Sequence, residues 1–202
     1  VQIVCAAIRV HGMTLLPWTP AARQWQARVL FMRGIEGEAH TWPDVADTAL
    51  LGALEEWLAP HLTGITRAAQ LQHMPLLDIL HAFVPWKQRN ELERLAPTHL
   101  EVPSGSRIAL DYTAGATPVL AVRLQELFGM HETPRIAGGR VAVLVHLLSP
   151  ARRPVQVTQD LASFWRTTYQ QVRKELRGRY PKHYWPEDPL TAVPTRRTTR
   201  KP

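Results

Sequence analysis

Arginine and lysine side chains recur at helical spacing in one stretch near the end of the chain. Arg166, Arg173 and Arg177 are separated by seven and four residues, which places them on one face if the segment is an α-helix. A guanidinium group binds two phosphate oxygens at once, and a helix would hold three such groups in register along a nucleic-acid backbone. The same stretch and the loop before it contain five further candidate cations: Arg152, Arg153, Lys174, Arg179 and Lys182. These eight residues are predicted to bind nucleic acid.

The distribution of charge favours this interpretation. The chain has a net charge of +7, but residues 1–97 carry 8 Lys/Arg against 9 Asp/Glu, and residues 98–150 carry four of each. Residues 151–202 carry 12 Lys/Arg against 4 Asp/Glu, so the whole basic excess lies in the last quarter of the chain. Such an asymmetry is typical of a surface that meets a polyanion. Two other interpretations stay open: a solvated helix face, and a face that docks on acidic surface of another domain.

Sequence motifs of catalysis are missing. The chain contains no G-x-x-x-x-G-K-[ST] phosphate loop, no G-x-S-x-G serine motif and no H-E-x-x-H zinc motif. Cys5 is the single cysteine, which excludes an intrachain disulfide and a thiolate metal cluster. We therefore predict no catalytic residue, no metal site and no cofactor in this chain. The lack of disulfides favours a reducing, cytoplasmic location.

A long helix is expected to position the cations. Asp160 can cap its first turn and Gly178 can end it, so the pattern predicts a helix over residues 160–178. Apolar residues follow the i, i+3, i+4 pattern of one buried face: Leu161, Phe164, Trp165, Thr168, Val172 and Leu176.

Alternating apolar and polar residues before this helix indicate β-strands. Residues 98–102 and 107–113 flank a Pro-Ser-Gly turn and predict a hairpin. Further strands are expected over residues 117–122, 140–147 and 155–158, with a short helix over residues 123–128. We predict that these strands form a small antiparallel sheet on which the long helix packs.

The first half of the chain is predicted to be helical. Thr19-Pro20 is a helix start, and Trp25, Val29 and Met32 fall on one face of the helix that follows. Asp44 is expected to cap the next helix, and proline residues are expected to open two more, at Pro75 and Pro85. The predicted class is therefore α+β. The predicted domains are a helical domain over residues 1–97, an α+β domain over residues 98–189 and a basic flexible tail over residues 190–202.

Three stretches of the sequence match a known pattern. Residues 95–108 (LAPTHLEVPSGSRI), residues 118–129 (PVLAVRLQELFG) and residues 146–189 resemble the C-terminal region of HrpB-type ATP-dependent helicases of the DExH-box class. Leu16-Pro-Trp-Thr also fits that family, and the resemblance covers essentially the whole chain. Tyr184 departs from the pattern, which has proline at this position before Trp-Pro-Glu-Asp-Pro.

The resemblance implies a parent protein whose upstream RecA-like domains bind ATP and Mg²⁺ and remodel nucleic acid, with RNA as the expected substrate. None of the family's ATPase residues lies in this stretch, so it implies no catalytic role for any residue here. The implied function is an accessory region that binds RNA or single-stranded nucleic acid and supports the motor domains in cis. The alternative is a protein-interaction or bracing module that does not contact nucleic acid. No membrane contact is expected, because the apolar run at residues 141–148 is too short to span a bilayer.

Overall fold

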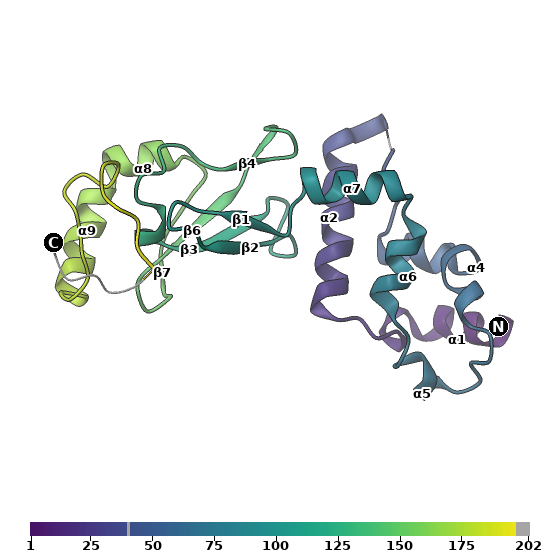
Figure 1. Ribbon diagram of the computed structural model, residues 1–202. Coiled ribbons are helices and arrows are strands. Elements are labelled where there is room, and N and C mark those ends of the chain that lie inside the picture. Colours follow the sequence, from purple (N-terminus) through teal and green to yellow (C-terminus); the bar gives the residue numbers. More distant parts are fainter. Residues whose placement is uncertain (40, 197–202) are drawn as a thin grey trace. The chain divides into compact units, whose positions relative to one another are not determined.

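The computed structural model describes residues 1–39 and 41–196. The chain divides into two compact units, Val1–Ala96 and Pro97–Pro202, which we call the helical unit and the sheet unit (Figure 1). Each unit has its own hydrophobic core, and each is described by itself.

The helical unit is built from short helices joined by tight turns. Its described α-helices are α1 (Gln2–His11), α2 (Pro20–Glu36), α3 (Asp47–Gly52), α4 (Leu54–Trp57), α5 (Ala68–Leu71), α6 (Leu76–Phe83) and α7 (Trp86–Leu95). Three 3₁₀ turns lie between them: η1 (Met13–Leu15), η2 (Gly37–Ala39) and η3 (Ala59–His61). The predicted start of α2 is confirmed, since the Thr19 side chain accepts a hydrogen bond of 3.1 Å from the backbone N–H of Ala22.

The core of the helical unit forms along α2. Trp25, Val29 and Met32 are buried as predicted, and α2 packs against α6 and α7. Arg28 lies on the same helix and is only 4% exposed. Its Nε donates to the carbonyl oxygen of Ala96 at 2.6 Å, and its Nη2 lies 2.8 Å from the Glu93 carboxylate. A buried arginine therefore ties α2 to the last turn of α7.

The predicted cap of the third helix was wrong. Helix α3 begins at Asp47, and the Asp44 carboxylate instead accepts a hydrogen bond from the N–H of Ala46 in the preceding turn. The Asp47 carboxylate accepts bonds from Arg23 at 2.6 Å and from Gln26 at 2.8 Å. Asp47 is thus fixed to α2 by two side chains, and this places the first turn of α3. The helix then breaks at Gly52-Ala53, because glycine is a poor helix former.

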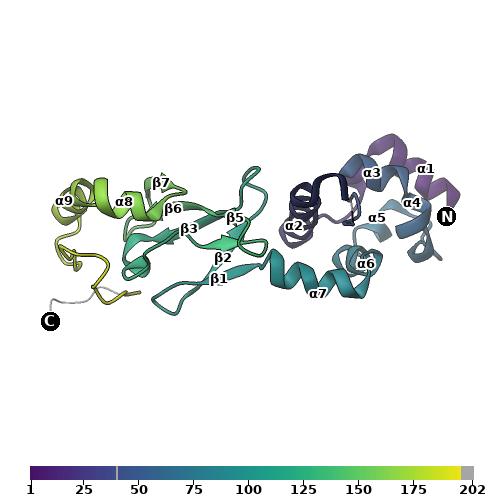
Figure 2. The ribbon, with the colours of Figure 1, turned by 90° about the horizontal axis from the view of Figure 1, so that it is seen from above.

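The sheet unit confirms the α+β class. Within its described residues, the main sheet has five strands in the order β1 (His99–Glu101), β2 (Arg107–Asp111), β3 (Val119–Arg123), β6 (Leu144–Leu148) and β7 (Pro154–Thr158) (Figure 2). A second sheet pairs β4 (Arg135–Ile136) with β5 (Val141–Ala142). The short helix expected after β3 is a 3₁₀ turn, η4 (Leu124–Leu127).

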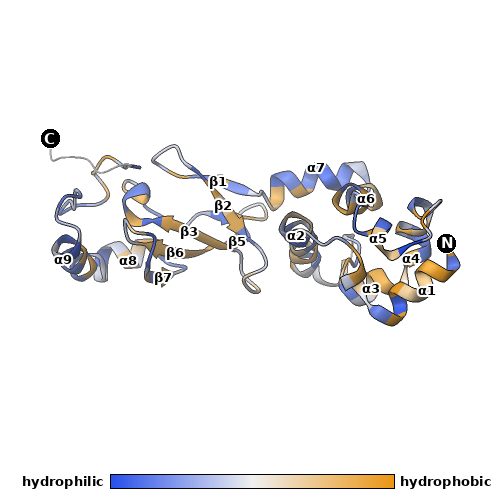
Figure 3. Cartoon of the chain, turned by 90° about the horizontal axis from the view of Figure 1, so that it is seen from below, coloured by the Kyte–Doolittle hydropathy of each residue, from blue (hydrophilic) through white to orange (hydrophobic). Residues whose placement is uncertain are grey.

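The prediction of a purely antiparallel sheet was wrong at its centre. β3 and β6 pair in parallel, with Val119 opposite Leu144 and Arg123 opposite Leu148. Both strands have few polar side chains, as Figure 3 shows by their orange colour, and Leu120, Val145 and Leu147 are fully buried. Parallel strands need a long connection, and η4 with the β4–β5 hairpin supplies it here. Strand-by-strand alternation does not reveal such a pairing, because it depends on residues far apart in sequence.

The predicted long helix is two helices. Residues 161–167 form α8 (Leu161–Thr167), residues 169–179 form α9 (Tyr169–Arg179), and the two run in different directions in Figure 1. The break is at Thr168. The residue before it, Thr167, is also β-branched, and its Oγ1 donates a hydrogen bond of 2.8 Å to the carbonyl of Ser163, one turn earlier in the helix. Such back-bonding bends helices. Burial of Tyr169, whose hydroxyl donates to the Pro186 carbonyl at 2.8 Å, fixes the new direction.

The Asp160 cap of α8 is confirmed and gives a first stability prediction. The Asp160 carboxylate accepts a 2.8 Å hydrogen bond from the N–H of Ser163. Asp160→Ala should therefore lower the free energy of unfolding by about 1 kcal/mol, the usual loss for a helix N-cap. Asp160→Asn keeps a hydrogen-bond acceptor at the same place and should be as stable as the unsubstituted chain. Thermal unfolding of the three proteins checks this, and equal midpoints for alanine and parent would show that the cap is not needed.

Residues 190–196, the described part of the predicted tail, make contacts with the sheet unit. The Thr195 N–H donates to the Gln125 carbonyl at 3.0 Å, and Arg196 Nε donates to the Ser104 carbonyl at 2.9 Å. Just before this segment, the Gly129 N–H donates to the Pro189 carbonyl at 2.9 Å. The chain therefore runs along η4 instead of leaving the surface. The rest of the predicted tail, residues 197–202, lies outside the described residues.

Candidate nucleic-acid interface

Seven of the eight predicted cations are exposed. None of the seven has a side-chain hydrogen bond or ion pair within the part of the chain that the structure describes. We call this set the basic surface: Arg152, Arg153, Arg166, Lys174, Arg177, Arg179 and Lys182. Their charges are not neutralised by neighbouring carboxylates, so they are available to an external anion.

The eighth residue, Arg173, is bonded to other residues of the sheet unit. Its side chain is 19% exposed, and its Nε donates to the carbonyl oxygen of Trp185 at 3.0 Å. Its guanidinium also lies 3.6 Å from the Glu187 carboxylate. Arg173 therefore holds the segment after α9 against that helix.

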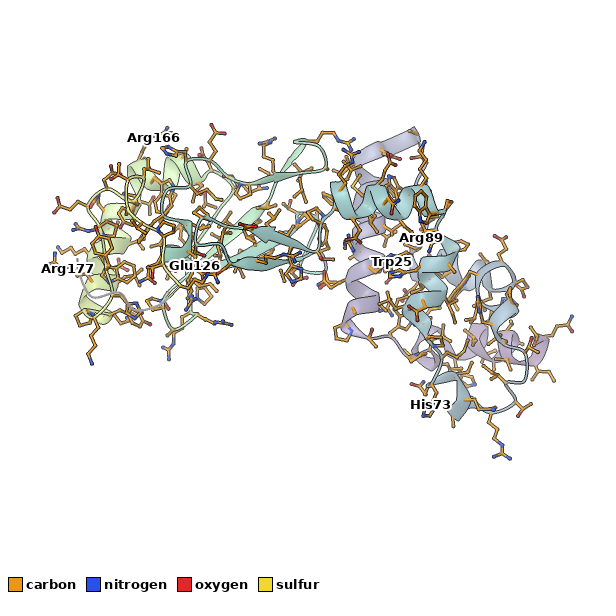
Figure 4. All side chains as sticks on the ribbon, viewed as in Figure 1. Trp25, His73, Arg89, Glu126, Arg166 and Arg177 are labelled. Atoms are coloured by element: carbon orange, nitrogen blue, oxygen red, sulfur yellow. The ribbon has the colours of Figure 1, made fainter. Side chains whose placement is uncertain are left out.

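The single helical stripe predicted for Arg166, Arg173 and Arg177 does not exist. Arg166 lies on α8, and the other two lie one turn apart on α9. Figure 4 shows Arg166 and Arg177 on these two differently directed helices. A nucleic acid that contacted both would have to follow the bend between α8 and α9.

The loop between β6 and β7 is linked to the end of α9. The hydroxyl of Ser149, a buried residue, accepts hydrogen bonds from the Arg153 N–H at 3.1 Å and from the Tyr180 hydroxyl at 3.3 Å. Tyr180 directly follows the last residue of α9. Ser149 thus fixes the turn that carries Arg152 and Arg153 close to the end of the helix that carries Arg177 and Arg179.

A hollow of about 500 Å³ lies between α9 and residues 181–187. We call it the α9 hollow. Cations and aromatic rings share its lining, which includes Arg173, Arg177, Lys182, His183, Tyr184, Trp185 and Glu187. Sequence reasoning identified the cations but not the hollow, because the chain after α9 had to fold back onto the helix to create it.

Hydrogen bonds hold the folded-back segment in place. The His183 N–H and the Trp185 Nε1–H both donate to the Tyr180 carbonyl, at 3.1 Å and 3.0 Å. The Gln125 amide lies 3.0 Å from His183 Nδ1. Partial burial, with a smaller effect of the nearby Arg123 charge, lowers the pKa of His183. Its imidazole is therefore mainly neutral at pH 7, and it adds no charge to the hollow.

Among residues 1–39 and 41–196, no group of three or more His, Cys, Asp or Glu side chains is arranged to hold a metal ion. No described helix is long and apolar enough to cross a membrane.

Comparison with known proteins decides the family. A family model described as "ATP-dependent helicase C-terminal", HrpB_C, matches residues 57–189. The chain is also 44% identical over 199 residues to the ATP-dependent RNA helicase HrpB of Escherichia coli (strain K12). The chain belongs to the HrpB helicase C-terminal family. This confirms the resemblance seen in the sequence.

Solved HrpB structures share the fold of this HrpB-family chain. The crystal structure of the E. coli DExH-box NTPase HrpB matches 96% of the chain with a TM-score of 0.88 and 44% identity. A crystal structure of the Escherichia coli DEAH/RHA helicase HrpB matches 90% of the chain with a TM-score of 0.74 and 41% identity. The chain spans 24% of the first of these proteins and 23% of the second. It thus corresponds to the C-terminal part of an ATP-dependent helicase.

Proposed function

We propose that this helicase C-terminal region binds single-stranded nucleic acid, RNA in particular, through the basic surface. In this proposal the region has no catalytic residue of its own and supports the motor domains in cis. Those domains would bind ATP and Mg²⁺, in the cytoplasm. The observation that carries the proposal is that seven exposed cations of the sheet unit lack internal partners among the described residues.

The physical basis is the release of counterions. A nucleic-acid backbone holds condensed cations, and each protein cation that replaces one of them contributes to affinity. Arginines already paired with carboxylates would lose that pairing on binding, which would cancel part of the gain. The basic surface has no such cost.

Binding should therefore weaken steeply as salt rises. On single strands the slope of log K against log salt is roughly −0.7 per phosphate contact. The double variant Arg152→Glu/Arg179→Glu should lose about tenfold or more in affinity for a single-stranded RNA at low salt, with a shallower slope. Fluorescence anisotropy of a labelled oligonucleotide across a salt series measures both quantities.

Exposed cations of the helical unit provide a matched control. Lys87→Glu/Arg94→Glu changes the net charge by the same amount on α7. This control should bind RNA within about twofold of the parent. Equal losses in both variants would mean that binding depends on net charge alone, and unchanged binding in the first variant would overturn the proposal.

A bracing role for the helical unit has its own support. Ile3 and Val10 lie seven residues apart on one face of α1 and are 86% and 78% exposed, while Cys5 and Ile8 on the other face are buried. Exposed apolar side chains that share a helix face favour contact with another protein surface. If the region braces the motor and does not bind RNA, the affinity of Arg152→Glu/Arg179→Glu for RNA will equal that of the unsubstituted chain at every salt concentration.

A further inference from the structure

The geometry of the α9 hollow points to a site for one unpaired nucleotide, with the phosphate at Arg177 and Lys182 and the base on the ring of Tyr184. This inference rests on the proposed function, because it assumes that the basic surface meets nucleic acid. It adds that the region selects single strands over duplexes, and it assigns that selection to one aromatic residue.

The size of the hollow fits a single nucleotide. Its volume of about 500 Å³ falls in the range of roughly 300–1,000 Å³ found for sites that enclose small organic ligands. A base pair within a duplex cannot enter such a space, since its bases are stacked on both faces and paired at their edges. An unstacked nucleotide can place its base in the hollow while its neighbours stay outside.

The charges of the hollow suit one phosphate. Arg177 and Lys182 both line it, both are exposed, and neither has a hydrogen-bond or ion-pair partner to give up among the described residues. Arg173 contributes a third positive charge, although its Nε is occupied by the Trp185 carbonyl. Among the described residues of the lining, the one carboxylate is that of Glu187, whose side chain is 89% exposed and 3.6 Å from Arg173. The three cations therefore outnumber the carboxylate, and the hollow has a net positive charge.

Tyr184 is the aromatic residue free to stack on a base. Its side chain is half-buried and makes no hydrogen bond or ring contact within the described chain. The rings of the two neighbouring residues already have partners within the chain. His183 and Trp185 contact each other with ring centroids 6.4 Å apart, and the Trp185 Nε1–H donates to the Tyr180 carbonyl. Aromatic stacking accepts any base, because every base presents a π face, so the site should be tolerant of sequence.

The lining is held before any ligand arrives. Besides the bonds of His183 and Trp185 to Tyr180, Gln170 Nε2 donates to the Glu187 carbonyl at 2.8 Å and Tyr169 donates to the Pro186 carbonyl at 2.8 Å. Pro186 and Glu187 are thus attached to α9, and His183 and Trp185 to Tyr180, the residue that follows it. A nucleotide would meet a preorganised surface, which lowers the entropy cost of binding.

Substitution of Tyr184 tests the inference on the full chain. The probes are a 12-nucleotide oligouridylate and a 12-base-pair RNA duplex, compared by fluorescence anisotropy at one salt concentration. Tyr184→Ala should weaken binding of the single strand about tenfold, the order found when a base loses its stacking partner. Duplex affinity should stay within about twofold, and Tyr184→Phe, which keeps the ring, should bind both probes like the parent.

The outcomes separate this inference from the proposed function. If Tyr184→Ala leaves single-strand binding unchanged while Arg152→Glu/Arg179→Glu weakens it, the region binds RNA but not through the hollow. If Tyr184→Ala weakens both probes equally, the ring does not select single strands. If neither variant changes binding, both proposals are wrong.

A carboxylate substitution gives a second test with the opposite sign. Glu187→Gln removes the negative charge of the hollow and frees Arg173 for the phosphate, so single-strand affinity should rise about twofold to threefold. Glu175→Gln makes the same charge change on α9 at a carboxylate that does not line the hollow and should have a smaller effect. Equal changes in the two variants, or no change in either, would overturn the placement of the phosphate.

Discussion

Methionine in place of Arg28 is expected to destabilise the helical unit by about 3 kcal/mol, because a buried carbonyl left without its donor costs roughly 1–3 kcal/mol. Arg28 donates to the carbonyl oxygens of both Leu92 and Ala96, at 3.3 Å and 2.6 Å. Methionine fills much of the same volume and donates nothing. The Glu93 carboxylate, 63% exposed, would remain hydrated and add little to the loss.

Amide hydrogen exchange would locate this loss. Peptides from α7 should exchange faster in Arg28→Met, since the last turn of α7 loses its link to α2. Arg94→Met removes an exposed cation from the same helix and should change stability by less than about 0.5 kcal/mol. Unchanged protection of α7 in Arg28→Met would show that water replaces the guanidinium without cost.

Alanine in place of Glu126 is expected to cost the sheet unit about 2–3 kcal/mol, since it leaves charged and polar partners of a buried carboxylate unpaired. Glu126 is 4% exposed. Its carboxylate accepts a 2.9 Å hydrogen bond from the Ser104 hydroxyl and lies 2.8 Å from the Arg123 guanidinium. Ser104 in turn accepts from Arg196, so the loss should also loosen the end of the described chain.

The same residue should make the sheet unit sensitive to acid. Burial by itself raises the pKa of Glu126, but hydrogen bonds from Ser106, Arg123 and Ser104 outweigh it and leave the pKa below its usual value. A carboxylate with a lowered pKa in the folded state stabilises the fold above its unfolded pKa of about 4.3, and this contribution is lost as the pH falls through the folded value.

The free energy of unfolding, measured between about pH 6 and pH 3, gives the contribution of the Glu126 carboxylate. The opening free energy of amides in η4 should fall with acid in the parent protein and fall less in Glu126→Gln, which has no carboxylate to titrate. The parent and the glutamine variant should become more alike at the acid end. Parallel curves over the whole range would assign the acid sensitivity to other groups.

Sequence signals that act within a few residues predicted where several helices begin. Thr19-Pro20, Pro75 and Pro85 each mark a helix start that the structure has, because proline and a capping hydroxyl act within one turn. The division of residues 160–178 into two helices was missed. Its causes are the Thr167 back-bond and the burial of Tyr169, and only the first is visible in the sequence.

The candidate site was predictable in its residue types but not in its geometry. Helical spacing and net charge identified the exposed cations. Nothing in that spacing distinguished Arg173, whose role depends on the carbonyl of Trp185, twelve residues later. The position of Tyr184 in the lining of the hollow likewise depends on the fold of residues 181–187 back onto α9.

The parallel pairing of β3 with β6 has a consequence for how the chain folds during synthesis. β1–β2, β2–β3 and β6–β7 are antiparallel pairs that can form from neighbouring residues, whereas the other edge of β3 must wait until residues 124–143 have been made and β6 has followed them. Until then the apolar edge of β3, with Val119, Leu120 and Val122, has no partner on that side. Unpaired strand edges of this kind promote aggregation, and pairings distant in sequence form slowly. A nascent chain that ends before residue 144 is therefore expected to expose this edge of β3 to aggregation.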